Sequence, residues 1–262
     1  MVNVLSENTN ASSDPDSADS MNLDELFLVV QPVVPLNSRD QPAYYEMLLR
    51  VRDDEGVVRT PDALFDPDAG DEVLQSIDEW VIRATVEWLS ENPSLSASVN
   101  VTPTSLRSGH ALVATREALE EFAVGPHRLM LEVPEGSVSA DPEAFRRTAS
   151  AAKELGLRMA IDDLGNEWQA LATIGDVGVD AIKIDGFWVS RATADDIAEI
   201  TIQSIVNAAR LIGARVVAEW IEDESTCEMM GGMGIEYGQG WLFGYPQPIE
   251  EIASGILMPQ LA

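Results

Sequence analysis

Lysine is almost absent from this chain. The 262 residues carry 16 basic side chains against 45 acidic ones, a formal net charge of −29, and the only lysines are Lys153 and Lys183. Because a surface this acidic repels nucleic acid and anionic membranes, we expect neither as a partner. Acidic surfaces also favour solubility in concentrated salt, which indicates a halophilic source, with generic acidity as the alternative.

Cysteine and histidine are also scarce. The single cysteine, Cys227, excludes an intrachain disulfide and a metal site built from cysteines. His110 and His127 show no ligand spacing, and we expect both at the surface. A bound metal would therefore be held by oxygen ligands, which favours Mg²⁺, Mn²⁺ or Ca²⁺ over structural zinc.

Long apolar runs are missing too. No stretch reaches the roughly 18 apolar residues of a membrane span, and the N-terminus lacks a basic region followed by an apolar one. We therefore expect a cytoplasmic protein. Residues 1–22 read as a disordered acidic tail, and residues 23–262 as one globular domain with enough apolar residues for a sizeable core.

After the tail, apolar runs alternate with segments of helical spacing. The runs that predict strands are Leu26–Val34, Tyr44–Val51, Leu95–Val101, Arg128–Val133, Leu157–Ile161, Val179–Ile184, Ala214–Ala218 and Tyr237–Phe243. The segments that predict helices are Glu72–Leu89, Ser105–Phe122, Asp141–Leu155, Ala194–Ile212 and Asp223–Gly231.

This alternation predicts an α/β fold, a (β/α)₈ TIM-like barrel in one domain. A doubly wound open sheet is the alternative, but no glycine-rich phosphate loop follows the first strand. Only a turn at Asn37–Asp40 separates the first two strands, which favours a hairpin. We therefore expect an irregular start to the barrel, with one antiparallel strand.

The run Met159–Gly165 ends in two adjacent acids, Asp162 and Asp163. Unpaired charges at the edge of a core oppose burial, so such a pair needs a metal ion, a cationic partner or solvent. Asp is also a common turn residue, so exposed loop acids are the alternative. The neighbouring strands decide between these interpretations.

Each predicted strand from the second onward brings a polar group to the rim where a barrel builds its site. In chain order these residues are Glu46, Asn100, Glu132, Asp162 with Asp163, Lys183 with Asp185, Glu219 and Gln239. Singly, Glu46 could be a surface residue, Asn100 a helix cap, and Lys183 the partner of a nearby acid. Together they predict two divalent cations bridged by an Asp, the usual centre for in-line attack on a phosphodiester.

Eight motifs in order carry a resemblance to a known family. They are Gln31-Pro32, Glu46–Arg50, Ser98–Val101, Leu131–Glu135, Ile161–Gly165, Ile182–Asp185, Val217–Glu222 and Gly238–Gly244. From about Leu23 to Ile256 the chain resembles the EAL-domain family of cyclic di-GMP-specific phosphodiesterases.

The resemblance implies a role for each matching residue. Glu46, Asn100, Glu132 and Asp162 would ligate one metal, and Asp162 or Asp163 with Glu219 the second. Catalytic roles fall to Lys183, near the attacking water, and to the ligands Glu46 and Glu219. Substrate contacts would come from Gln31, Leu49, Arg50 and Gln239, and Glu135 would support the loop after Asp163.

The resemblance also implies a reaction and partners. The reaction opens cyclic di-GMP to linear pGpG with two divalent cations, Mg²⁺ or Mn²⁺, in a homodimer. Regulation would come from a separate protein, from dimerisation or from the tail. Three positions depart from the family pattern: Met47 replaces an Ala, Asn166-Glu167 replaces Thr-Gly, and Trp220 replaces a Gly. The alternative is a weakly active or inactive EAL-like domain that serves as a cyclic di-GMP-binding effector or a protein-interaction module.

Overall fold

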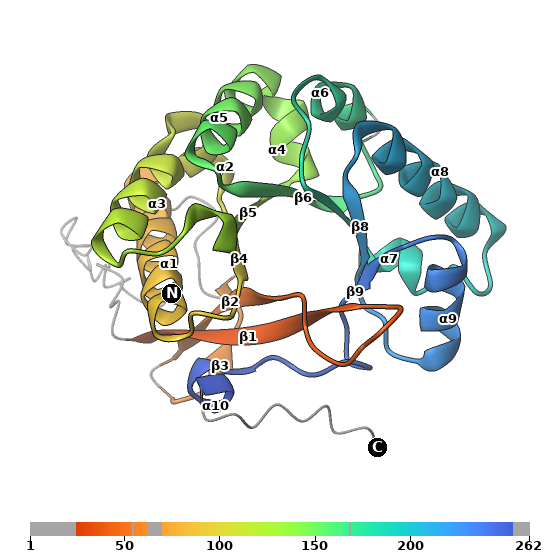
Figure 1. Cartoon of the computed structure of the whole chain (residues 1–262), viewed down its shortest axis with the longest axis horizontal. Coiled ribbons are helices and arrows are strands. Elements are labelled where there is room, and N and C mark those ends of the chain that lie inside the picture. The colour runs from red at the N-terminus through yellow and green to blue at the C-terminus, as the bar shows by residue number, and fades with distance from the viewer. Residues whose placement is uncertain (1–24, 54, 62–69, 168, 254–262) are drawn as a thin grey trace, which may run out of the picture.

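The strands close into a ring with helices around its outside (Figure 1). This computed structural model describes residues 25–53, 55–61, 70–167 and 169–253; the predicted tail lies outside them. Within the described residues, eight strands form the ring, in the order β1 (Leu26–Pro35), β2 (Tyr44–Arg52), β4 (Ala97–Asn100), β5 (Leu129–Pro134), β6 (Arg158–Leu164), β7 (Ala181–Ile184), β8 (Arg215–Ala218) and β9 (Tyr237–Gly238). The TIM-like barrel is confirmed.

The first strand runs against all its ring neighbours. β1 pairs antiparallel with β2, from Leu26 opposite Val51 to Val33 opposite Tyr44, and antiparallel with β9. The other neighbouring ring strands pair in parallel. The predicted hairpin and antiparallel strand are therefore confirmed. Two short strands pair with strands of the ring: β3 (Val58–Arg59) with β2, and β10 (Gln247–Pro248) with β1.

Helices cover the outside of the parallel part of the ring (Figure 1). Their bounds are α1 (Asp71–Glu91), α2 (Pro103–Ser108), α3 (His110–Glu121), α4 (Glu135–Ala140), α5 (Pro142–Leu155), α6 (Ala170–Val177), α7 (Gly186–Val189), α8 (Asp196–Ile212), α9 (Glu224–Gly232) and α10 (Ile249–Ala253), with a 3₁₀ turn at Pro126–Arg128. Arg128 donates to the carbonyls of Leu89 and Asn92 at the end of α1 and to that of Leu95, which satisfies acceptors that the helix leaves open.

Two predicted elements differ from the structure. The helix expected over Ser105–Phe122 is divided at Gly109, whose φ of 76° ends α2 and starts α3. The strand expected over Tyr237–Phe243 stops after Gly238. At Gly240 the backbone passes so close to Ile221 that a Cβ would lie 2.2 Å from its carbonyl oxygen, and φ is 152°. Only glycine fits there, and the chain turns away from the sheet.

The ring interior is built in layers because side chains alternate along a strand. An apolar layer consists of Val33, Tyr44, Met130, Ala160, Ala181 and Val217, with Tyr237 packed against it. On the parallel strands, two residues further along, the same face carries Glu46, Glu132, Asp162, Lys183 and Glu219. On the antiparallel β1 the order reverses, and Gln31 precedes Val33. One apolar layer therefore supports the whole polar rim.

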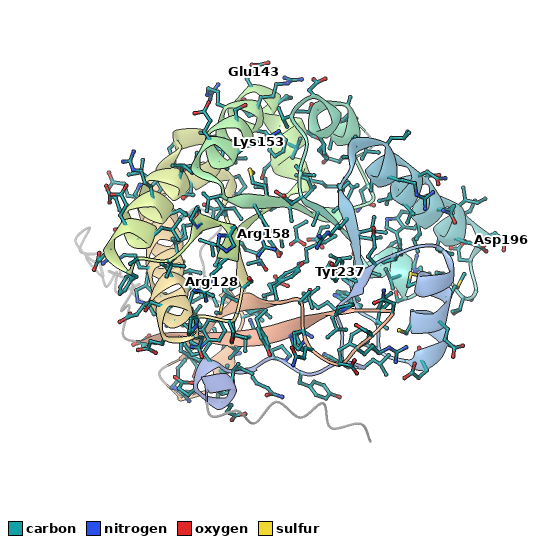
Figure 2. All side chains as sticks on the ribbon, in the orientation of Figure 1. Arg128, Glu143, Lys153, Arg158, Asp196 and Tyr237 are labelled. Carbon is teal, nitrogen blue, oxygen red and sulfur yellow. The ribbon has the colours of Figure 1, made fainter. Side chains whose placement is uncertain are left out.

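The opposite end of the interior is basic. Arg158 and Arg215 stand two residues before Ala160 and Val217, and Figure 2 shows Arg158 and Tyr237 inside the ring. Arg215 donates a hydrogen bond of 2.8 Å to the Tyr237 hydroxyl. The two ends of the barrel thus carry opposite charge, with the acids gathered at the carboxyl ends of the parallel strands.

Candidate active site

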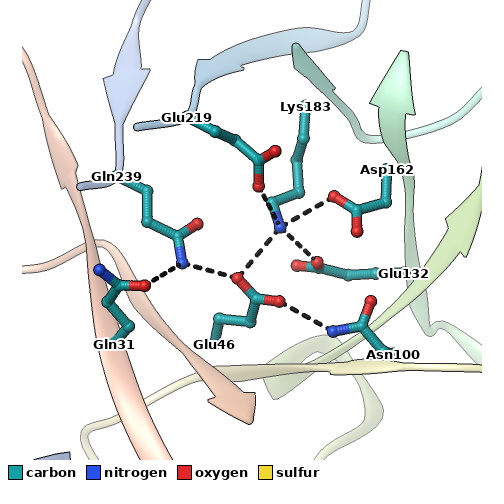
Figure 3. Close-up of polar contacts among 8 residues, drawn as sticks. All are labelled: Gln31, Glu46, Asn100, Glu132, Asp162, Lys183, Glu219 and Gln239. Atoms are coloured by element: carbon teal, nitrogen blue, oxygen red, sulfur yellow. Dashed lines mark hydrogen bonds and ion pairs between the residues drawn. The ribbon is translucent and has the colours of Figure 1, made fainter. Parts of the chain in front are cut away.

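Four carboxylates surround the ammonium group of Lys183 (Figure 3). Lys183 Nζ lies 2.7 Å from Glu132 Oε2, 2.8 Å from Glu219 Oε1, 2.9 Å from Asp162 Oδ1 and 3.1 Å from Glu46 Oε2. Lys183 is only 1% exposed. One positive charge cannot balance four negative ones in a buried centre, so this arrangement has room for further cations.

Amide side chains hold Glu46 in place. Asn100 Nδ2 donates to Glu46 Oε1 over 2.8 Å, and Gln239 Nε2 donates to Glu46 Oε2 over 2.6 Å. Gln239 also donates to Gln31 Oε1, and Gln31 in turn donates to the Gly244 carbonyl, both over 3.1 Å. Gln31 reaches this chain of hydrogen bonds from the antiparallel β1 (Figure 3).

Burial and the neighbouring charges pull these groups in different directions. Burial lowers the pKa of Lys183, but the surrounding acids outweigh it and hold that pKa well above its usual range. Burial likewise raises the pKa of Glu46, yet Lys183, Gln239 and Asn100 reverse the effect and leave it below its ordinary value. Glu46 and Lys183 therefore form a stable ion pair at neutral pH.

Glu132, Glu219 and Asp163 hold protons more tightly than usual. Burial, opposed by Lys183 and reinforced by Glu46 and Asp162, raises the pKa of Glu132 to about 8. Burial also raises the pKa of Glu219 well above its usual range. At Asp163, desolvation followed by the charges of Asp162 and Asp185 raises the pKa to about 6, although its side chain reaches solvent. Divalent cations would relieve this crowding by replacing the protons.

Asp162 and Asp163 reach the same rim although they are neighbours on one strand. Successive strand residues normally point to opposite faces. Here the pairing between β6 and β7 shifts register between Ile161 and Leu164, and Asp163 has a left-handed φ of 56°. Asn and Asp tolerate this conformation better than most residues. The distortion turns both carboxylates toward the barrel mouth, which the sequence pattern alone does not show.

The donor set fits an oxygen-ligated divalent cation. One carboxylate oxygen from each of Asp162, Asp163 and Glu219 lies within 4.8 Å of the others. Among the described residues, the buried atoms Glu132 Oε1 and Gln239 Oε1 accept no hydrogen bond. Clustered carboxylates and free acceptors of this kind suit Mg²⁺, Mn²⁺ or Ca²⁺.

Glu135 holds the loop that follows β6. Its carboxylate accepts from the backbone N–H groups of Gly165 and Asn166 at 3.0 Å each, and of Glu167 at 3.3 Å. The side chains at 166 and 167 play no part in these bonds. Among described non-glycine residues, positive φ occurs at Arg39, Ala123, Asp163 and Trp220. Glu167 is not one of them, so the loop does not need glycine at 167.

The two predicted substrate residues on β2 point to different faces. Arg50 follows Glu46 by four residues and so shares its face, beyond the rim. The Arg50 guanidinium donates a hydrogen bond to the Leu49 carbonyl, and burial lowers its pKa. Leu49 points the other way and packs against the apolar core. The structure therefore brings Arg50 toward the mouth, and Leu49 away from it.

A cavity of about 620 Å³ lies elsewhere. It is lined by Val30, Val34, Tyr45 and Phe243 among others, on the faces of β1 and β2 opposite to Gln31 and Glu46. None of the rim acids lines this cavity, so the candidate active site is the rim.

Together, the closed barrel and its acidic rim define an α/β barrel with a candidate cation site at the carboxyl ends of its parallel strands. A sequence model described as the EAL domain matches residues 16–246, and this chain belongs to the EAL domain family. No helix among the described residues is long and apolar enough to cross a membrane.

Curated relatives include the cyclic di-GMP phosphodiesterase PdeF of Escherichia coli (strain K12), which is 30% identical over 86% of this chain. The cyclic di-GMP phosphodiesterase PdeB of Shewanella oneidensis is 25% identical over 88% of the chain. The matches span 30% and 28% of those proteins, so the chain covers less than a third of their length.

A solved structure, described as PaMucR phosphodiesterase in complex with c-di-GMP, has a TM-score of 0.81 at 24% identity. The match covers 87% of this chain and 94% of that one. At this level of identity the likeness bears on the fold, which it supports over nearly the whole barrel.

Proposed function

We propose that this chain is a metal-dependent phosphodiesterase that hydrolyses cyclic di-GMP to linear pGpG in second-messenger signalling. The observation that carries the proposal is the group of four carboxylates around Lys183, within 2.7–3.1 Å of one ammonium group. A fold without catalysis has no physical reason to bury so many acids at one rim. The phosphodiesterase names of the curated relatives agree with this interpretation.

The rim residues divide into two ligand groups. Glu46, Asn100, Glu132 and Asp162 would hold one divalent cation, and Asp162, Asp163 and Glu219 the second, as Mg²⁺ or Mn²⁺. When bound, such a pair acidifies water and stabilises the charge that develops on a phosphate. Glu132 Oε1, an acceptor that the described residues leave open, supports the place of Glu132 in the first group.

The remaining rim residues would position the reactants. The Lys183 ammonium would hold the attacking water beside the acids, because it is the cation nearest to all four. Gln239 and Asn100 fix the orientation of the Glu46 carboxylate. Gln31 would contact the dinucleotide, and Arg50 would contact its phosphate from above the rim.

The alternative is a domain that binds the dinucleotide or a protein partner without turnover. The altered loop at Asn166-Glu167 and the residue Trp220 motivated it. The altered loop is weak support for this alternative, because Glu135 holds the loop through backbone N–H groups, which every residue except proline has whatever its side chain. We also propose a homodimer and control by a separate regulatory protein; light scattering after size exclusion tests the first.

The decisive assay incubates purified protein with cyclic di-GMP and Mn²⁺ or Mg²⁺ and measures pGpG by chromatography. We expect turnover that chelation abolishes and that Glu46→Gln reduces at least about 100-fold, because the substitution removes a ligand charge. Tight binding without turnover in either metal would favour the effector role. Neither binding nor turnover, at low or high salt, would refute both.

Lysine scarcity offers a matched pair of variants. Lys183→Met leaves four acids without their cation, so we expect activity to fall at least about 100-fold and the metal-free protein to lose about 3–5 kcal/mol of stability. Lys153→Met changes an exposed residue on α5 and should alter neither. Urea denaturation and the pGpG assay measure both effects. Equal behaviour of the two variants would contradict the role given to Lys183.

A further inference from the structure

Trp220 has an unusual position for so large a side chain. It directly follows Glu219 beyond the end of β8, and it is 61% exposed. Its φ of 54° lies in the left-handed region, which is rare for a bulky residue. Strained backbone of this kind collects at sites where the surrounding structure uses it.

Gly186 makes room for the indole. A Cβ at residue 186 would lie 2.1 Å from Trp220 Cγ and 2.2 Å from Cδ2, so the ring rests directly on the backbone at the start of α7. Any other residue at 186 would displace it. Ile184 pairs with Ala218, so Gly186 and Trp220 stand just past the adjacent ends of β7 and β8. The ring thus lies at the rim, with one side seated on glycine and a large part of its surface free.

The surroundings of the indole match one kind of ligand. Gly186 follows Asp185 and Trp220 follows Glu219, and both acids belong to the charged environment of the candidate cation site. A ligand whose phosphates approach that site has its bases beside the rim. Aromatic side chains that flank a phosphate-binding centre are suited to stacking on such bases.

We propose that Trp220 is a substrate-contacting residue that stacks on one of the two guanine bases of cyclic di-GMP. This role rests on the proposed function, because it takes the dinucleotide as the ligand. Stacking uses the π-face that every base has, so Trp220 contributes affinity rather than selection for guanine. Gly186 contributes by leaving the ring flat against the backbone.

The test compares Trp220→Phe, Trp220→Leu and Trp220→Gly with the unchanged protein. The dissociation constant for cyclic di-GMP is measured by calorimetry in EDTA, and KM and kcat in Mn²⁺. We expect Trp220→Leu and Trp220→Gly to weaken binding and raise KM on the order of tenfold, with kcat within about threefold. Trp220→Phe keeps an aromatic face and should stay within a few-fold of the parent.

Trp220→Gly adds a second readout. Glycine adopts a left-handed backbone without strain, so this variant should unfold at the same temperature as the parent or higher while it binds more weakly. Weaker binding without a lower unfolding temperature indicates a contact with the ligand. A packing role would instead lower both the affinity and the unfolding temperature. Leu211→Ala, at an 89% exposed position on α8, is the control and should change neither.

Three results would overturn the stacking role alone. They are unchanged binding and KM in Trp220→Leu, a loss of kcat without a change in affinity, and an altered oligomeric state with normal affinity. The last would assign Trp220 to a contact between copies of the chain. A parent protein that neither binds nor hydrolyses cyclic di-GMP would instead refute the proposed function and this role with it.

Discussion

Lys183 shows how a single residue can be identified from its rarity. A lysine in an apolar run stands out in a chain with only one other. Its neighbours were also expected, because each predicted strand from the second onward brings a polar group to the same rim of a barrel. The contacts themselves were not, since no sequence pattern indicates that one ammonium group reaches acids from β2, β5, β6 and the segment after β8.

Glu132 makes the metal-free protein sensitive to pH. Burial raises its pKa to about 8, whereas an unfolded Glu titrates near about 4.3. The folded state therefore binds the proton more tightly, so this contribution to stability is fully present below about pH 4.3 and is lost as pH rises through about 8. In EDTA, we expect the free energy of unfolding to fall between pH 5 and 8, by at most about 1.4 kcal/mol per pH unit for this proton.

Urea denaturation across this pH range measures the effect. The glutamine in Glu132→Gln cannot ionise, so this variant should show a smaller change of the free energy of unfolding with pH. That difference separates the contribution of Glu132 from those of the other acids. Divalent cations compete with the same protons, so Mg²⁺ should stabilise the protein more at pH 8 than at pH 6, where the pKa of Asp163, about 6, also leaves that ligand half protonated. A slope that Glu132→Gln does not change would contradict the assignment.

Two residue features were beyond sequence reasoning. The left-handed conformation of Asp163 arises from the register shift in β6, and an Asp pair alone does not encode it. The contact of Trp220 with Gly186 joins residues 34 positions apart. Trp220 was noted as a departure from the family pattern, but nothing in the sequence paired it with Gly186, because such complementarity exists only once β7 and β8 lie side by side.

At the scale of elements, β6 and its loop depend on one buried acid. Glu135 is 6% exposed and receives three backbone N–H groups. Glu135→Gln removes the charge from these bonds and one of the acceptor oxygens, so we expect a loss of about 1–3 kcal/mol in stability. Because the loop directly follows Asp162 and Asp163, activity should fall on the order of tenfold or more.

Glu167→Gly is the matched control for this loop. It keeps the N–H group that Glu135 receives and removes a negative charge near the mouth. Activity in the pGpG assay should therefore equal or exceed that of the parent. If Glu167→Gly and Glu135→Gln lose activity equally, the side chain at 167 rather than the backbone docking would matter.

The long helices followed from the sequence, whereas several short helices did not. α1, α5 and α8 have apolar stripes that span several turns, so their periodicity is clear. α4, α6 and α7 have 6, 8 and 4 residues, too few for a periodic signal, and their packing on the ring decides their conformation. The strand expected over Tyr237–Phe243 ends at Gly238, because Gly240 requires a turn where the aromatic content favoured a longer strand.

At the scale of the whole molecule, the net charge of −29 is the main feature that the fold does not explain. Like charges repel in the compact state, and salt reduces the range of this repulsion from about 10 Å at 0.1 M to about 3 Å at 1 M. We propose adaptation to high salt and expect the unfolding temperature to rise by several degrees between 0.1 and 2 M KCl. Thermal scans by circular dichroism measure this, with sucrose as the uncharged control.

An unchanged or lower unfolding temperature in KCl would contradict adaptation to salt. A rise of the same size in sucrose would assign the effect to general exclusion of solute from the surface rather than to charge. We expect the barrel fold to be the same in KCl and in sucrose, because its core is apolar and its ring closes by backbone hydrogen bonds.

The reversed direction of β1 determines where the chain enters the molecule. Leu26 pairs with Val51 and Phe27 with Arg50, so the strand begins beyond the acidic rim and runs down toward the basic end. In a barrel of uniformly parallel strands, the first strand would begin at the far end instead. The chain before Leu26 is therefore attached on the side of the acidic rim. A force on that attachment acts first on β1, which carries Gln31, and on its partner β2, which carries Glu46.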